Sequence, residues 1–144
     1  MMEKDHIGIL IKKNSQTFDK AAGHILAPHS LTPSQFKILK YVILKPEASV
    51  RQIDIEAYFC MSNPTVTGIL QNLEKKELIY RQAHPKDKRS KIIRLTDKAK
   101  NARGFILETS DQIEANFTEK LTDAEKNTLR RLLLKLLNSK DIMK

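Results

Sequence analysis

The stretch that decides the fold of this chain runs from Pro85 to Thr96 and reads PKDKRSKIIRLT. Its first half is polar and basic, and its second half, 91–95, is rich in the β-branched and aliphatic side chains typical of strands. A second run of this kind, 78–83, precedes it. The pattern predicts two short strands joined by a basic tip, which is a hairpin suited to reach toward a phosphate backbone.

The segment upstream of this hairpin predicts a helix over 62–76. Its apolar residues recur at helical spacing and form one stripe, which consists of Val66, Ile69, Leu70 and Leu73. A shorter helix is predicted over 49–58, and a turn around Cys60 joins the two. Two short helices joined in this way form a helix-turn-helix, whose second helix enters the major groove. With the hairpin, they predict a winged helix-turn-helix DNA binder.

Apolar spacing and helix-capping residues predict the remaining helices. A first long helix is expected over about 5–26, and others begin at Thr32, Thr96 and Thr122. Capping boxes are predicted at Thr32 with Gln35, Ser49 with Gln52, and Thr122 with Glu125, and either Ser62 or Asn63 caps the 62–76 helix. The predicted fold class is mainly α with a small β-hairpin (α+β). We expect a single domain, 1–144, with a winged-helix core of about 32–96 flanked by helical segments, about 5–27 and 97–140.

Composition limits the partners and the compartment. The chain has 144 residues and a formal net charge of +9, from 26 Lys+Arg against 17 Asp+Glu, which favours a polyanionic partner, although basic proteins also bind acidic membranes. Cys60 is the only cysteine, so no intramolecular disulfide is expected. Neither a signal-peptide core nor an apolar run of membrane-spanning length is visible. We therefore expect a cytoplasmic protein without a membrane partner.

The polar side of the 62–76 helix supplies the first candidate DNA contacts. Amide and hydroxyl side chains can bond base edges or phosphates, a lysine neutralises phosphate, and a glycine permits close backbone approach. The candidates are Ser62, Asn63, Thr65, Thr67, Gly68, Gln71 and Lys75. The alternative is an ordinary solvated helix face.

The hairpin tip supplies the second set of candidates. These residues are Lys86, Lys88, Arg89, Ser90 and Lys91. An arginine at a loop tip can enter a narrow minor groove, where the potential is most negative, and Arg89 is in that position. Asp87 would repel phosphate, so we expect it to stabilise the wing by pairing with an arginine or by capping the turn. The alternative is a solubilising charged hairpin on an edge strand.

The 62–76 segment and the wing together resemble the MarR family of bacterial transcription regulators. The family's wing pattern is Asp-any-Arg, then about five residues, then Leu-Thr, and Asp87, Arg89 and Leu95-Thr96 match it. The resemblance implies base- or backbone-reading positions at Thr65, Thr67 and Gly68 and a minor-groove role for Arg89. One departure is Glu77, where the family often has a glycine that ends the helix in the left-handed conformation.

The resemblance also implies the partners. These are a second copy of the chain, in a homodimer built through the first helix and the last two, and double-stranded DNA with a pseudo-palindromic operator. Most members repress a gene, and many release DNA when a small ligand, often phenolic, enters a cleft. The lining of such a cleft would draw on Phe18, Phe36, Tyr41 and the helix after Thr96, although these residues would serve the core equally well. No cofactor is expected.

Two other functions fit the same fold class. One is a nonspecific or architectural DNA-binding protein, which would not need Asn63, Thr65 and Gln71 where bases would be. The other is a winged-helix protein-interaction module, which would not need the basic tip around Arg89. An enzyme is not expected, because neither a Gly-rich phosphate loop nor a nucleophile with a recognisable base is present.

Histidines and the cysteine predict little further chemistry. The four histidines (His6, His24, His29 and His84) are scattered, whereas a zinc site needs about four converging ligands, so no metal site is expected. Cys60 lies at the predicted turn between two helices, where a small buried residue is expected. We therefore favour packing for Cys60 over a redox switch.

Overall fold

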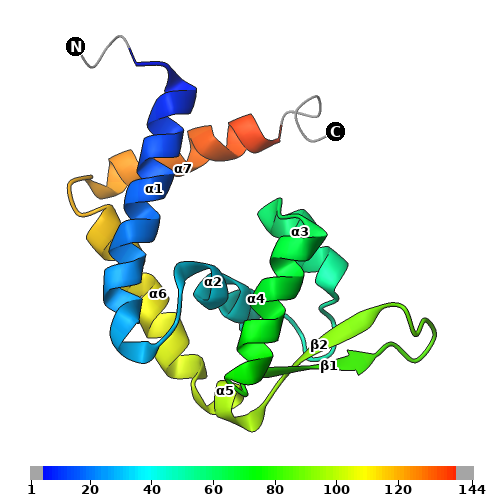
Figure 1. Cartoon of the computed structure of the whole chain (residues 1–144). Helices are drawn as coiled ribbons and strands as arrows, with labels where there is room; N and C mark the ends of the chain where they lie inside the picture. The colour runs from blue at the N-terminus through cyan, green and yellow to red at the C-terminus, as the bar shows by residue number, and fades with distance from the viewer. Residues whose placement is uncertain (1–4, 139–144) are drawn as a thin grey trace.

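The computed structural model describes residues 5–138 as a chain of helices interrupted by a single hairpin (Figure 1). The elements in chain order are α1 (Ile7–Leu26), the 3₁₀ helix η2 (Ala27–His29), α2 (Pro33–Leu44), α3 (Gln52–Phe59), α4 (Asn63–Lys75), β1 (Ile79–Ala83), β2 (Lys91–Leu95), α5 (Asp97–Asn101), α6 (Arg103–Phe117) and α7 (Asp123–Leu137). This order confirms the mainly helical winged-helix fold predicted from the sequence. None of the described helices is long and apolar enough to cross a membrane.

The core lies where α2, α3 and α4 meet the hairpin and the lower parts of α1 and α6. The largest fully buried side chains are Leu26, Ile38, Leu39, Ile55, Val66, Leu70, Leu73, Ile93 and Ile106. The predicted stripe of α4 is confirmed, because Val66, Leu70 and Leu73 are buried and Ile69 packs partly buried against them. Burial of each leucine-sized side chain stabilises the fold by about 1.5–3 kcal/mol, so the apolar stripe fixes which face of α4 stays exposed.

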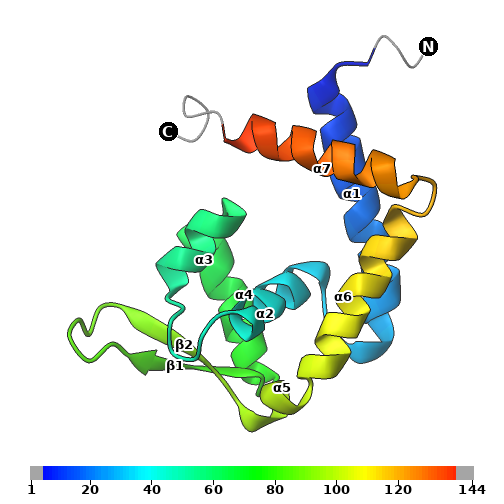
Figure 2. The ribbon, with the colours of Figure 1, turned by 180° about the vertical axis from the view of Figure 1, so that it is seen from behind.

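The hairpin is antiparallel and extends from the lower end of the molecule, as both views show (Figures 1 and 2). Its register pairs Ile79 with Leu95 and Ala83 with Lys91. The chain before α3 pairs with the other edge of β2, since the Ile93 N–H donates to the Val50 carbonyl at 2.8 Å. The wing therefore rests on the segment that leads into the helix-turn-helix.

This pairing shows that the capping box predicted at Ser49 was wrong. Residues 50–51 are extended because they pair with β2, so α3 begins only after Arg51. The Asp54 carboxylate accepts from the Arg51 N–H at 2.9 Å, and the Ser49 hydroxyl donates instead to the Pro46 carbonyl at 2.6 Å.

The other predicted helix starts are confirmed. Reciprocal capping boxes join Thr32 with Gln35 and Thr122 with Glu125. Ser62, rather than Asn63, caps α4. Thr96 caps the next helix, but this helix is shorter than the sequence suggests: α5 ends at Asn101, and α6 follows after a bend at Ala102.

Helices α1 and α6 run side by side, and the Phe18 and Phe117 rings meet edge-to-face at 5.1 Å. Helix α7 lies at the end of the molecule opposite the hairpin in both views (Figures 1 and 2). The wing and the last helix are thus separated by the body of the core.

Candidate nucleic-acid interface

Helix α4 presents a polar face that its packing leaves outside the core. Ser62, Asn63, Thr65, Gln71 and Lys75 are exposed, whereas Thr67 and Gly68 are half-buried. A Cβ atom built on Gly68 would meet nothing within 4 Å, so the chain itself does not fill the space beside this residue. The α4 candidates therefore share one helix, and the amide and hydroxyl groups at its beginning are accessible.

Two residues of α3 that sequence reasoning missed contact the beginning of α4. The Asn63 amide nitrogen donates to the Glu56 carboxylate at 2.9 Å, and the Gln52 amide nitrogen donates to the Thr67 hydroxyl at 2.8 Å. Gln52 also donates to Glu56 at 3.2 Å. Their spacing of four residues on one helix places Gln52 and Glu56 on one face, which was the signal available in the sequence.

The wing tip is held in shape by hydrogen bonds to its own backbone. The Asp87 carboxylate accepts from the Arg89 N–H at 3.0 Å, and the Ser90 N–H donates to the Asp87 carbonyl at 3.0 Å. Asp87 therefore caps the turn, and among residues 5–138 it forms no ion pair with an arginine. The His84 N–H closes the loop onto the Ser90 carbonyl at 3.0 Å.

The basic side chains of this tip are left accessible. Lys86, Lys88, Arg89 and Lys91 are exposed, and Ser90 is half-buried. In the described part of the chain, none of these four cations takes part in an ion pair. A shaped backbone with unpaired cations can contact phosphates or enter a groove without first breaking an internal salt bridge.

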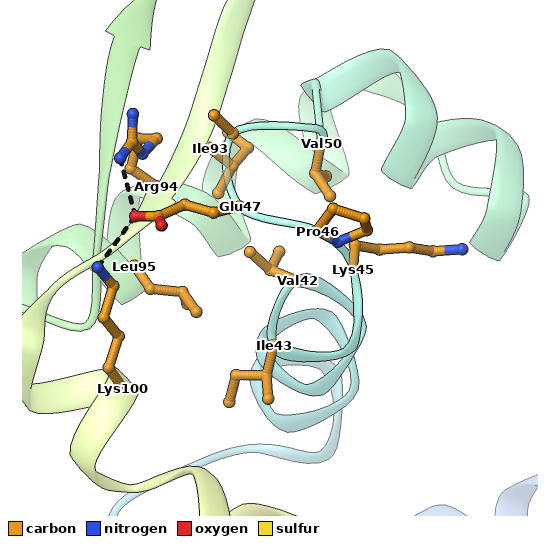
Figure 3. Close-up of a pocket in the computed structure, with 11 residues that line it drawn as sticks. Val42, Ile43, Lys45, Pro46, Glu47, Val50, Ile93, Arg94, Leu95 and Lys100 are labelled. Atoms are coloured by element: carbon orange, nitrogen blue, oxygen red, sulfur yellow. Dashed lines mark hydrogen bonds and ion pairs between the residues drawn. The ribbon is translucent and has the colours of Figure 1, made fainter.

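An ion-pair cluster supports the base of the wing (Figure 3). The Glu47 carboxylate accepts from Arg94 of β2 at 2.9 Å and from Lys100 of α5 at 3.0 Å. The Lys100 and Arg94 hydrogen bonds hold the pKa of Glu47 below its usual range. Arg94 also donates to Gln82 across the hairpin at 3.0 Å. The cluster therefore connects β2 to the segment between α2 and α3, which carries Glu47, and this segment to α5.

A small cavity of about 140 Å³ lies beside this cluster. Its apolar lining includes Val42, Ile43, Val50, Ile93 and Leu95, as Figure 3 shows. The aromatic residues expected to line a ligand cleft are elsewhere: Phe36 is buried in the core, Phe18 packs on Phe117, and Tyr41 stacks on Tyr58 with ring centroids 4.7 Å apart.

The end of α4 keeps the left-handed turn even though it carries Glu77. Glu77 has a φ of 59°, its N–H donates to the Glu74 carbonyl, and the Leu78 N–H donates to the Leu73 carbonyl. This is the hydrogen-bond pattern of a Schellman cap. A non-glycine residue in this conformation costs about 1–2 kcal/mol, and the Thr96 hydroxyl, which donates to the Glu77 carbonyl at 2.7 Å, helps to hold it.

The expectation that Cys60 is buried was wrong. Cys60 is exposed and has a φ of 54°, because it is the left-handed residue that ends α3. Its position serves the backbone of the turn rather than the core. Within residues 5–138, His, Cys, Asp and Glu form no group of three or more that could hold a metal ion.

The sequence and the fold of this chain are similar to those of known transcriptional regulators. The model of the MarR family matches residues 31–91. The transcriptional regulator MgrA of Staphylococcus aureus is 29% identical over 117 residues, which are 81% of this chain and 77% of that protein. A crystal structure of the transcription regulator MarR from Oenococcus oeni matches with 30% identity and a TM-score of 0.73, covering 93% of this chain and 100% of that one. The S. aureus MepR–DNA complex matches with 27% identity and a TM-score of 0.83, over 94% of this chain and 99% of that one. The chain belongs to the MarR family of winged helix-turn-helix transcriptional regulators.

Proposed function

We propose that this protein is a homodimeric repressor that binds a pseudo-palindromic operator, with α4 in the major groove and the wing tip in the minor groove. The observation that carries the proposal is the tip itself. Its backbone is fixed by Asp87, while Arg89 and the neighbouring lysines are exposed and make no ion pair within residues 5–138. Such a tip fits the strongly negative potential of a narrow minor groove.

Relatives support DNA as the partner. S. aureus MepR was crystallised with DNA, and a mutant of Escherichia coli MarR was crystallised with operator DNA. This chain has a net charge of +9, which favours a polyanion. Because its lysines and arginines would release counterions from the phosphates, its affinity should fall steeply with salt.

The outer helices support a dimer. No residue of α7 is buried, and Leu129, Leu132, Leu133, Leu134, Leu136 and Leu137 are all at least 40% exposed. Ile7, Ile9 and Ile11 of α1 are exposed as well. An exposed apolar surface of this kind supports a protein–protein contact. A two-fold dimer would set its two α4 helices about one DNA turn apart, roughly 34 Å.

Release by a small ligand completes the proposal. A ligand that binds better to a dimer with the wrong spacing of its α4 helices would shift the population away from the DNA-bound form. It can do so only through its differential affinity for the two states. An effector, phenolic or of another class, is therefore proposed to act on the dimer geometry rather than on the DNA contacts.

The test is a fluorescence anisotropy titration at near-physiological salt. The protein is titrated against a duplex from upstream of its own coding region and against a shuffled duplex. We expect a preference of about a thousandfold or more for the native duplex. Equal affinity for both would contradict sequence-specific regulation from this region and favour the nonspecific DNA binder, and binding to neither would favour the protein-interaction module.

A further inference from the structure

Gln52 and Glu56 lie one turn apart on α3 and face the beginning of α4. Three contacts connect the two helices: Asn63 Nδ2 to Glu56 Oε2 at 2.9 Å, Gln52 Nε2 to Thr67 Oγ1 at 2.8 Å, and Gln52 Nε2 to the Asn63 carbonyl at 3.5 Å. Within α3, Gln52 Nε2 also donates to Glu56 Oε2 at 3.2 Å. Both α4 side chains are among the residues proposed to contact DNA. Each is therefore already hydrogen-bonded within the protein before DNA arrives.

The chemistry of these partners fixes which atom faces which. An ionised carboxylate and a backbone carbonyl can only accept hydrogen bonds. The nitrogen of Gln52, and not its oxygen, must therefore point at Glu56 and at the Asn63 carbonyl. By the same reasoning, Asn63 must turn its nitrogen toward Glu56. The carboxylate removes the freedom to flip that a side-chain amide otherwise has.

The fixed orientation of these amides determines which hydrogen-bonding groups of Thr67 and Asn63 remain available to another partner. The Thr67 oxygen accepts a hydrogen from Gln52, so the hydroxyl hydrogen of Thr67 is free to be donated elsewhere. Asn63 keeps its carbonyl oxygen and one amide hydrogen for another partner. The exposed edge of α4 thus has a defined order of donors and acceptors.

We infer that Gln52 and Glu56 are positioning residues that determine base specificity, an inference that rests on the proposed DNA-binding function. They occupy one acceptor site of the Thr67 hydroxyl and leave its hydrogen to be donated to a phosphate oxygen or to an acceptor of a base edge. They hold Asn63 with its oxygen and remaining hydrogen in one order, which suits the N6 and N7 atoms of adenine. A base pair that required the Asn63 amide in the reversed orientation would not be bound in this way.

The charge of Glu56 contributes in a second way. A carboxylate beside the leading edge of a helix that approaches DNA repels the phosphates in every complex, specific or not. Only a complex in which Asn63 and Thr67 find their base partners offsets that repulsion. Glu56 is thereby expected to lower the affinity for unrelated sequences more than the affinity for the operator.

The test compares Glu56→Gln with the wild-type protein on a panel of duplexes. Each duplex carries one substituted base pair in a half-site of the upstream region. A glutamine at this position can donate or accept, so Asn63 and Gln52 are free to flip. We expect discrimination at the base pairs under the beginning of α4 to fall roughly 5- to 100-fold and binding to shuffled DNA to strengthen. Glu108→Gln is the matched control, because it removes the same charge from an exposed position on α6 that joins no ion pair in the described chain.

A second variant separates orientation from charge. Gln52→Met removes the donor to Thr67 without changing the charge, so it should reduce discrimination without strengthening the binding of shuffled DNA. Thermal unfolding should match the wild-type curve for both α3 variants. The inference would be overturned if a variant changed the affinity for all duplexes uniformly, or if both variants kept the wild-type base preference. In either case the proposed function would still stand, provided that the wild-type protein prefers its own duplex. A wild-type protein without any preference would overturn both.

Discussion

The winged-helix part of the molecule and helix α7 use their apolar residues in opposite ways. In the first, Leu70 and Leu73 of α4 and Ile93 of β2 are at most 1% exposed, because helices and hairpin enclose them. In α7, six leucines are between 40% and 58% exposed, although the helix begins with a complete capping box. Local sequence signals such as caps predict the helices of both regions, but only the winged-helix part buries its apolar side chains within a single chain.

This difference indicates where a second copy would contribute. An isolated helix of about 15 residues is marginal in water, and most helical stability comes from burying an apolar face. Helix α7 spans 15 residues and buries none of them. The proposed dimer would supply the missing surface. Changes in α7 are therefore expected to act on assembly, and changes in the wing on DNA contact within an intact dimer.

The largest effect is expected from Leu133→Glu in α7. A charge in a dimer contact would be buried without a partner, so the protein should sediment as a monomer at micromolar concentration. Operator affinity should fall roughly 10²- to 10⁴-fold, because two linked contacts become independent. Asn127→Glu, at a position on the same helix that is already polar, serves as the control and should leave the mass unchanged. A Leu133→Glu protein that remains dimeric would show that α7 is not the contact.

A smaller effect is expected from Arg89→Ala in the wing. Loss of the cation that we propose to enter the minor groove should weaken operator binding by about 1–3 kcal/mol, roughly 5- to 150-fold, and should leave the dimer intact. The control is Lys126→Ala, which removes the same charge from α7, at the opposite end of the molecule from the hairpin. Both proteins are titrated with the same duplex by anisotropy. Equal losses would show that the wing acts only through net charge.

The sequence predicts those parts of this molecule that depend on neighbouring residues. The caps at Thr32 and Thr122, the buried stripe of α4 and the two strands of the wing all follow from local spacing. The left-handed conformation of Glu77 would not follow from its residue type. The hydrogen bonds of the helix end and of Thr96 hold it in place.

What the sequence did not predict depends on residues far apart in the chain. The start of α3 is displaced because Val50 pairs with β2, more than forty residues away. The contacts from Gln52 and Glu56 to α4 exist only once the two helices have packed. Within the candidate interface, residue types therefore predict which groups are available, whereas the order of donors and acceptors comes from tertiary contacts.

The smallest effect is expected within the winged-helix part, at Glu47, which lies between α2 and α3. Its carboxylate connects the wing strand to α5 through Arg94 and Lys100, and these cations lower its pKa in the folded protein. A lowered pKa stabilises the fold above the pKa of the unfolded chain, and this contribution is lost as the pH falls through the folded value. Glu47→Gln should therefore lower the melting temperature slightly at pH 7, since exposed ion pairs are weak, and by less near about pH 3, where more of the carboxyl groups are protonated. Scanning calorimetry at the two pH values, with Glu108→Gln as the control, measures this difference. An equal decrease at both would mean that the side chain acts by packing rather than by its charge.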